Sequence, residues 1–161
     1  LDVKRNTKGG RLRISPVVGS EEEIEIVKKL CEEAGASKIF PFPNQNADIH
    51  SYRAAYATRV YNQHKRDFAE FKNERLIVYK NKVVGSYATK NGRKSISKCK
   101  ELYTVVNGKR RMLSGYRDVS SAYYCRTDLK GVIYDRRALF EASRALGHNR
   151  ETVVADHYLH S

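Results

Sequence analysis

Three short stretches of the sequence carry side chains that suit chemistry at a phosphodiester. In His50-Ser51-Tyr52-Arg53, a histidine and an arginine lie three residues apart, a spacing that places both on one face of a helix. His148 follows Leu146-Gly147, and Tyr158 lies near the end of the chain. A tyrosine oxygen can attack phosphorus, while arginine and histidine can donate hydrogen bonds to the nonbridging oxygens, where charge builds in the transition state. His50, Arg53, His148 and Tyr158 are therefore candidates for one catalytic site.

Lys8 is the candidate general acid of the same site. Thr7-Lys8-Gly9-Gly10 lies between Val3 and the alternating Leu12 and Ile14, so the sequence predicts a basic β-hairpin with Lys8 near its tip. A hairpin tip can bring the ammonium group to the 5′-oxygen that leaves the phosphate. An ordinary tyrosine, with a pKa of about 10, is a poor nucleophile unless neighbouring cations favour its phenolate. The basic side chains would supply those cations.

The helices that must hold these residues begin at polar caps. They are predicted to cover about 49–62, 136–146 and 150–158. Asp48 caps the first and Asp135 the second, which ends at Gly147. His148 therefore follows a helix end directly, and Tyr158 lies at the end of the last helix.

An earlier helix is predicted over 21–34. Ser20 and Glu23 form a capping box before it, and Gly35 is its expected stop. Apolar residues recur in it at helical spacing and are expected to face the core: Ile24, Val27, Leu30, Cys31 and Ala34.

Residues 62–131 carry most of the excess charge. They hold 17 Lys and Arg against 6 Asp and Glu, which leaves +11 of the chain's +13, and six of its eleven tyrosines. Interleaved cations and aromatic rings indicate a polyanionic partner, nucleic acid foremost. The expected DNA-binding cations are Arg11, Lys109, Arg110 and Arg111. Three β-hairpins are predicted here, with strands at 76–79 and 83–87, at 102–106 and 109–113 around Asn107-Gly108, and at 123–126 and 132–134.

The composition narrows the class of protein. The 161 residues suit one domain with a real core. Cys31, Cys99 and Cys125 lack the spacing of a zinc site or a disulfide framework, so reduced thiols, a cytoplasmic location and no metal or cofactor are expected. No apolar run approaches the length that spans a bilayer, so no membrane partner is expected.

The motifs occur in the order seen in tyrosine recombinases, the family of the phage-type integrases. The local sequence is similar too, in Thr7–Arg13, His50–Thr58 and Ala145–Asn149. The resemblance covers both ends of the chain and leaves the middle uncovered, so we interpret about 62–131 as a basic insertion. The resemblance implies that the chain is the C-terminal part of a recombinase catalytic domain. The expected fold is α+β and mostly helical, with a small antiparallel sheet and a β-containing insertion.

The resemblance also implies a reaction. Tyr158 would be the nucleophile and form a 3′-phosphotyrosyl link to DNA, which a free 5′-hydroxyl later resolves. Lys8, His50, Arg53 and His148 would be the other catalytic residues. The implied setting is an integrase of a phage or conjugative element in a bacterial cell, acting on double-stranded DNA and self-associating there as a tetrameric synapse. The family's further arginine and DNA-binding domains are expected upstream of Leu1, so the 161 residues alone are expected not to recombine DNA.

Two alternatives stay open. A type IB topoisomerase shares the chemistry, although Leu146-Gly147-His148 favours a recombinase. A non-catalytic basic DNA- or RNA-binding domain would make the order of the motifs a coincidence. Tyr158 follows His148 by one residue more than is typical of the recombinases, so the last helix is expected to shift or bulge to deliver its hydroxyl.

Overall fold

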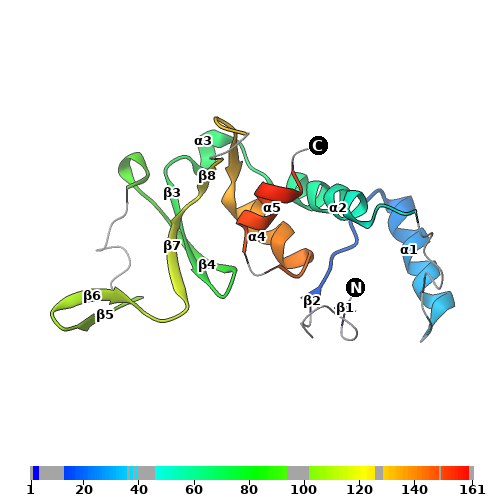
Figure 1. The fold of residues 1–161 in the computed structure, drawn as a ribbon, viewed down its shortest axis with the longest axis horizontal. Helices are drawn as coiled ribbons and strands as arrows, with labels where there is room; N and C mark the ends of the chain where they lie inside the picture. Colours follow the sequence, from blue (N-terminus) through cyan, green and yellow to red (C-terminus); the bar gives the residue numbers. More distant parts are fainter. Residues whose placement is uncertain are drawn as a thin grey trace.

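A computed structural model describes residues 2–3, 13–35, 37, 39, 46–93, 102–125, 129–148 and 150–159. They form a mixed α/β chain with small antiparallel sheets, which confirms the coarser part of the expected α+β class. The chain is drawn out along one axis, with helix α1 (Glu21–Ala34) at one end and a ribbon of two strands, β5 (Tyr103–Val106) and β6 (Lys109–Met112), at the other (Figure 1). Within the described ranges, no helix is both long and apolar enough to cross a membrane.

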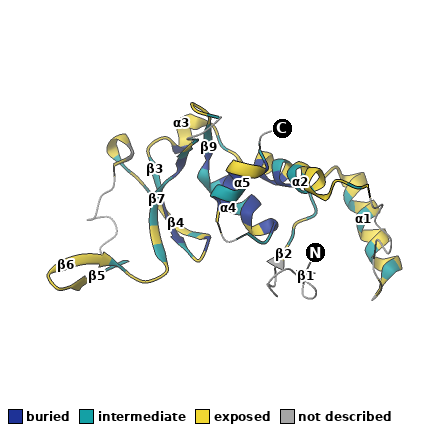
Figure 2. Ribbon diagram, in the orientation of Figure 1, coloured by how far each residue is buried: buried dark blue, intermediate teal, exposed yellow. Residues whose placement is uncertain are grey.

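A helical core occupies the middle of the molecule. It consists of α2 (Ile49–His64), α4 (Arg136–Ala145) and α5 (Thr152–His157). Asp48 caps α2 and Asp135 caps α4, and each side chain accepts hydrogen bonds from backbone N–H groups of the first turn, as the sequence predicts. Figure 2 shows the buried residues gathered on these helices. The fully covered members of their apolar cluster are Ala57, Val60, Ala138, Leu139, Ala142, Val154 and Ala155.

A three-stranded antiparallel sheet packs against α4. Its strands lie in the order β4 (Lys82–Ala88), β3 (Glu74–Tyr79) and β7 (Tyr116–Ser120). Leu76 and Val78 of β3 are fully buried and contact Phe140 of α4. The β3–β4 hairpin confirms a prediction, whereas the pairing of β3 with β7 is new. This sheet makes part of the 62–131 block continuous with the core.

The other two predicted hairpins of the block are also present, with small shifts in their bounds. Strands β5 and β6 pair around Asn107-Gly108, and both turn residues have the positive φ that a two-residue hairpin turn requires. The ribbon stands clear of the core and is mostly exposed. Strands β8 (Ala122–Tyr124) and β9 (Ile133–Asp135) pair and lead into α4. The described part of the block also contains two short helices, α3 (Phe68–Phe71) and a 3₁₀ helix at Lys90–Gly92.

The N-terminal part confirms one prediction and corrects another. Strands β1 (Asp2–Val3) and β2 (Arg13–Ile14) pair antiparallel, as the predicted first hairpin requires. Helix α1 has the capping box of Ser20 and Glu23 and ends at Gly35, as predicted. Its apolar stripe was expected to be buried, yet no residue of α1 is buried and Leu30 is 37% exposed. The periodicity of apolar residues predicts the helix but not what packs on it. Helix α1 lies at one end of the molecule, and the core does not bury it (Figure 1).

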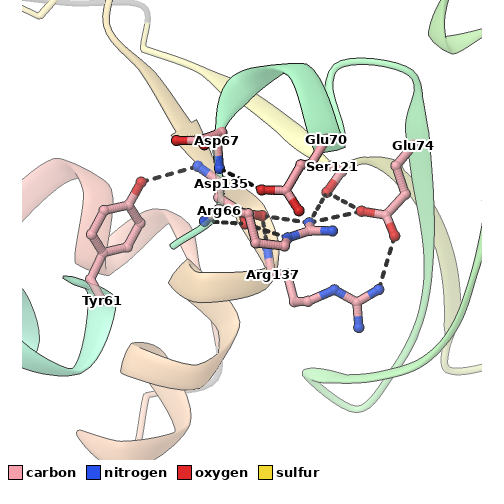
Figure 3. A network of polar contacts seen from close by, with 8 residues as sticks. All are labelled: Tyr61, Arg66, Asp67, Glu70, Glu74, Ser121, Asp135 and Arg137. Carbon is pink, nitrogen blue, oxygen red and sulfur yellow. Dashed lines mark hydrogen bonds and ion pairs between the residues drawn. The ribbon is translucent and has the colours of Figure 1, made fainter. Parts of the chain in front are cut away.

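A polar network joins the end of α2 to the start of α4 (Figure 3). Arg66 donates to Asp135 Oδ2 at 2.8 Å and to Glu74 Oε2 at 2.8 Å, and Arg137 donates to Glu74 Oε1 at 3.0 Å. Burial acts to raise the pKa of Glu74, but hydrogen bonds from partners that include Arg66 and Ser121 outweigh it and hold the pKa at about 2. The Asp135 carboxylate is completely buried, so its pairing with Arg66 is what makes its burial tolerable. The network fixes the angle between α2, which carries Arg53, and α4, whose end is followed by His148.

Candidate active site

Arg53 projects from the second turn of α2. Asp48 Oδ1 accepts hydrogen bonds from the backbone N–H groups of His50 and Ser51 at 2.9 and 3.1 Å, which fixes the start of the helix. Arg53 is half-buried, and its Nη2 donates to the carbonyl oxygen of Leu146 at 3.4 Å. The guanidinium is thereby directed at the turn that ends α4.

His148 belongs to that turn. Gly147 has a φ of 76°, in the left-handed region that glycine enters at little cost. The backbone N–H of Gly147 donates to Arg144 O at 3.0 Å, and that of His148 donates to Ser143 O at 2.8 Å. These two bonds form a Schellman motif, the common way in which a helix ends at glycine. The Leu-Gly-His sequence therefore places the imidazole at a fixed point just beyond α4.

Tyr158 follows the last residue of α5. Its N–H donates to Val154 O at 3.1 Å, and its carbonyl oxygen accepts from Thr58 Oγ1 of α2 at 3.4 Å. The next carbonyl, of Leu159, accepts from the Tyr134 hydroxyl at 3.2 Å. Only 9% of Tyr158 is exposed, so its ring is packed into the core.

Three of the predicted catalytic residues converge. Arg53 Nε donates to the Tyr158 hydroxyl oxygen at 3.5 Å, and Arg53 Nη2 lies 3.3 Å from His148 Nε2. The rings of His148 and Tyr158 are 5.5 Å apart, and the guanidinium carbon of Arg53 lies 5.9 Å from the centre of the Tyr158 ring. Arg53 precedes His148 by 95 positions and Tyr158 by 105 in the sequence, so folding alone brings them together.

Comparisons with known proteins add no assignment to this cluster. No protein-family model, curated protein or solved structure matches the chain. What the cluster does must therefore be inferred from its own geometry and chemistry.

The arrangement constrains proton positions. A guanidinium only donates hydrogen bonds, so His148 Nε2 must accept from Arg53, and a neutral imidazole then carries its proton on Nδ1. The Tyr158 oxygen also accepts from Arg53. Donation of this kind stabilises negative charge on the tyrosine oxygen and on any oxygen that takes its place. The cluster is thus suited to anionic oxygens, such as those of a phosphate.

A hollow of about 200 Å³ lies beside Arg53. Its lining includes the exposed Tyr52 and the buried Leu146. The Ser15 hydroxyl donates to Ala145 O at 2.8 Å on its wall, which ties the segment after β2 to α4. Within the ranges that the structure describes, no group of three His, Cys, Asp or Glu could hold a metal ion.

The remaining predicted catalytic residues stand apart from this cluster or outside the description. His50 is exposed, one turn before Arg53 on α2. Lys8 and Arg11 lie outside the described residues. The strands on either side of them, β1 and β2, are paired, and the chain just after β2 is held to the core through Pro16, whose carbonyl oxygen accepts from Tyr56 at 2.8 Å.

The other expected DNA-binding cations lie on the ribbon. Lys109, Arg110 and Arg111 are all exposed on β6. Opposite pairs fix the faces of the ribbon: Arg111 pairs with Thr104 and Lys109 with Val106 on one face, whereas Arg110 lies on the other. The ribbon projects from the end of the molecule opposite α1 (Figure 1).

Two supporting residues were missed by the sequence argument. Asn81, at the β3–β4 turn, donates from Nδ2 to His148 O at 3.2 Å and to Ser143 Oγ at 3.1 Å. This turn belongs to the block that we interpret from the sequence as an insertion, and it reaches the backbone of His148. The Ser143 hydroxyl lies 3.0 Å from Arg150 O. A lone asparagine between two strands gives no sequence signal beyond that of a turn.

Glu151 is a third missed residue, and it anchors the start of α5. Its side chain is 2% exposed and accepts from Arg117 of β7 at 3.3 Å and from Arg136 of α4 at 3.1 Å. Burial lowers the pKa of Arg136, and its pairing with Glu151 opposes that effect. A buried acid with two arginines sets where α5 begins and hence where Tyr158 falls.

Proposed function

We propose that the chain carries part of a site that cleaves and rejoins DNA strands through a 3′-phosphotyrosyl intermediate, as in tyrosine recombinases. The observation that supports this most directly is the convergence of Arg53, His148 and Tyr158, in which Arg53 hydrogen-bonds the Tyr158 oxygen and lies 3.3 Å from the His148 ring. The parent protein would be a site-specific recombinase of a phage or other mobile element, acting on double-stranded DNA as an assembly of several copies.

The proposed reaction is a balanced exchange of esters. The Tyr158 oxygen attacks the phosphorus and releases its proton to solvent, and the bond from phosphorus to the 5′-oxygen breaks. Lys8 donates the proton that the departing 5′-oxygen needs. Arg53, His50 and His148 donate hydrogen bonds to the nonbridging oxygens. A 5′-hydroxyl then attacks the phosphotyrosyl bond, the steps reverse, and no net oxidation or hydrolysis occurs.

The exposed ribbon supports DNA as the substrate. Lys109, Arg110 and Arg111 stand on an element that contributes nothing to the buried core, so their charges are free to meet phosphates. Contacts of this kind hold a protein on DNA without selecting a sequence. We therefore assign binding to the ribbon and cleavage to the Arg53 cluster.

Covalent attachment tests this proposal. The full-length protein is incubated with a pool of duplexes whose middle is randomised and in which one internal 5′-bridging oxygen is replaced by sulfur. A thiolate departs without needing a proton, and it rejoins poorly, so cleaved DNA stays on the protein and resists detergent. Wild type should form the adduct, and Tyr158→Phe should not. Tyr124→Phe is the matched control because Tyr124 is 56% exposed and lies on β8.

The same pool separates the alternatives. A narrow set of recovered sequences supports a site-specific recombinase, and a broad set supports a type IB topoisomerase. Binding without any adduct would reject both enzymes and leave a nucleic-acid-binding domain. Lys8→Ala should lose activity on ordinary DNA and regain it on the sulfur-containing DNA. Equal loss on both would remove Lys8 from the role of general acid.

A further inference from the structure

The β3–β4 turn touches the candidate site through the side chain of Asn81. The turn consists of Lys80 and Asn81, both with positive φ, at 45° and 65°. Asn81 is 8% exposed, although a turn residue is ordinarily in solvent. Its amide points away from its own strands, toward the end of α4, where it meets Ser143 and His148. The hairpin therefore ends inside the cluster of residues that holds the imidazole.

The hydrogen-bond pattern shows what Asn81 contributes. Among the described residues, the Ser143 hydroxyl at 3.3 Å and Asn81 Nδ2 at 3.2 Å lie within reach of His148 O. Ser143 has one proton, and its closer acceptor is Arg150 O at 3.0 Å. When that proton serves Arg150 O, the amide of Asn81 is the donor that holds His148 O. The carbonyl oxygen of His148 fixes the amide orientation as well, because only Nδ2 can donate to it.

Stability alone does not explain an asparagine at this position. Glycine suits the second residue of such a turn at least as well. Asn81 Oδ1 is also buried with no hydrogen-bond partner among the described residues, which is unfavourable. The gain must come from the donating end of the amide, which acts on the turn that carries His148.

We infer that Asn81 is a positioning residue for His148, so that the β3–β4 hairpin of the middle block forms part of the cleavage site. This inference rests on the proposed function. His148 is then held by its N–H through Ser143 O and by its carbonyl through Asn81. Fixing both backbone groups fixes the place from which the ring reaches Arg53. In metal sites, loss of an outer contact that orients a ligand typically costs about 10- to 100-fold in activity, and we expect the lower end of that range here.

A cycle of variants tests the coupling. Asn81→Gly keeps the turn and removes the amide, and it should slow adduct formation at saturating DNA about tenfold with DNA affinity unchanged. In a His148→Ala background the same change should have no further effect, because its action passes through His148. The matched control is Asn91→Gly, which removes an exposed asparagine of similar backbone conformation, with φ of 58°, and should change neither rate nor affinity.

A second measurement stands apart from cleavage. The ring nitrogen signals of His148 are recorded by NMR in the DNA-free chain, assigned with His148→Ala. Asn81→Gly should shift them and Asn91→Gly should not. If wild type forms no adduct, the proposed cleavage function fails, yet these signals still decide whether Asn81 positions His148.

Two results would overturn the inference. One is rate losses that simply add in the double variant, and the other is His148 signals that do not respond to Asn81→Gly. If Asn81→Gly does not fold, Asn81→Asp replaces it, because a carboxylate keeps the size of the side chain but cannot donate to His148 O. Normal cleavage with this variant would reject the inference as well.

Discussion

Two hairpins of the middle block, β3–β4 and β5–β6, lie in opposite environments. Both turn through two residues of positive φ, Lys80-Asn81 in β3–β4 and Asn107-Gly108 in β5–β6. Yet β3 is buried along Leu76–Val78, whereas the ribbon is exposed along most of its length. Turn chemistry decides that a hairpin forms, and the apolar content of its strands decides whether it is buried. The hairpin whose strand carries Leu76, Ile77 and Val78 is scaffold, and the ribbon, whose strand β6 carries three consecutive cations, remains available to a partner.

This contrast has a functional side. The buried hairpin holds the backbone of His148 through Asn81, and the exposed hairpin presents Lys109, Arg110 and Arg111. We therefore expect mutations in the first to affect folding and cleavage, and mutations in the second to affect DNA binding alone.

The largest expected effect is on folding. Phe140 is fully buried between α4 and β3, so Phe140→Ala should lower the free energy of unfolding by ~3–5 kcal/mol. Val105 on the ribbon is 65% exposed, and Val105→Ala should change the free energy of unfolding by less than ~0.5 kcal/mol. Urea unfolding followed by circular dichroism measures both. Similar losses for the two variants would remove the distinction between scaffold and ribbon.

A moderate effect is expected in acid. The folded-state pKa of Glu74 is about 2, below the ordinary value of 4.5, so its ionised form stabilises the fold. That contribution is complete above about pH 4.5 and is lost as pH falls toward 2. Glu74→Gln should therefore flatten the fall in stability across this window. Glu25→Gln on α1, where the exposed Glu25 pairs with the exposed Lys28, should leave the fall as steep as in wild type.

The smallest effect on folding should come from the ribbon cations. Lys109→Ala, Arg110→Ala and Arg111→Ala together should change the free energy of unfolding by less than ~0.5 kcal/mol. DNA binding should respond instead, since each lost phosphate contact reduces the slope of log affinity against log salt by about 0.9, or about 3 for all three. Filter binding over a salt series measures the slope. The control variant changes Lys28, Lys29 and Lys130, which are exposed elsewhere, to alanine. If the slope falls equally in both variants, the ribbon makes no specific contribution to DNA binding.

Much of the local structure follows from the sequence. The caps at Ser20, Asp48 and Asp135 and the glycine stops at Gly35 and Gly147 all fall where short-range rules place them. The three hairpins of the middle block do too. These features depend on neighbours within a few residues. The order of the motifs also predicts that Arg53, His148 and Tyr158 belong to one site, and the structure brings these three together.

What the sequence does not give is long-range. The pairing of β3 with β7, the network of Arg66 with Glu74 and Asp135, and the contact of Asn81 with His148 join segments far apart in the chain. No local pattern marks such partners. The wrong prediction for α1 has the same origin, because an apolar stripe states that a face is apolar and not what covers it.

The most direct test of the account is to identify the residue that carries DNA after cleavage. The detergent-resistant adduct is digested with protease and nuclease, and the peptide that retains a nucleotide is sequenced by mass spectrometry. The account predicts a nucleotide linked through its 3′-phosphate to Tyr158, in the peptide that follows His148. Attachment to another tyrosine, such as the exposed Tyr52 beside Arg53, would contradict the proposed site.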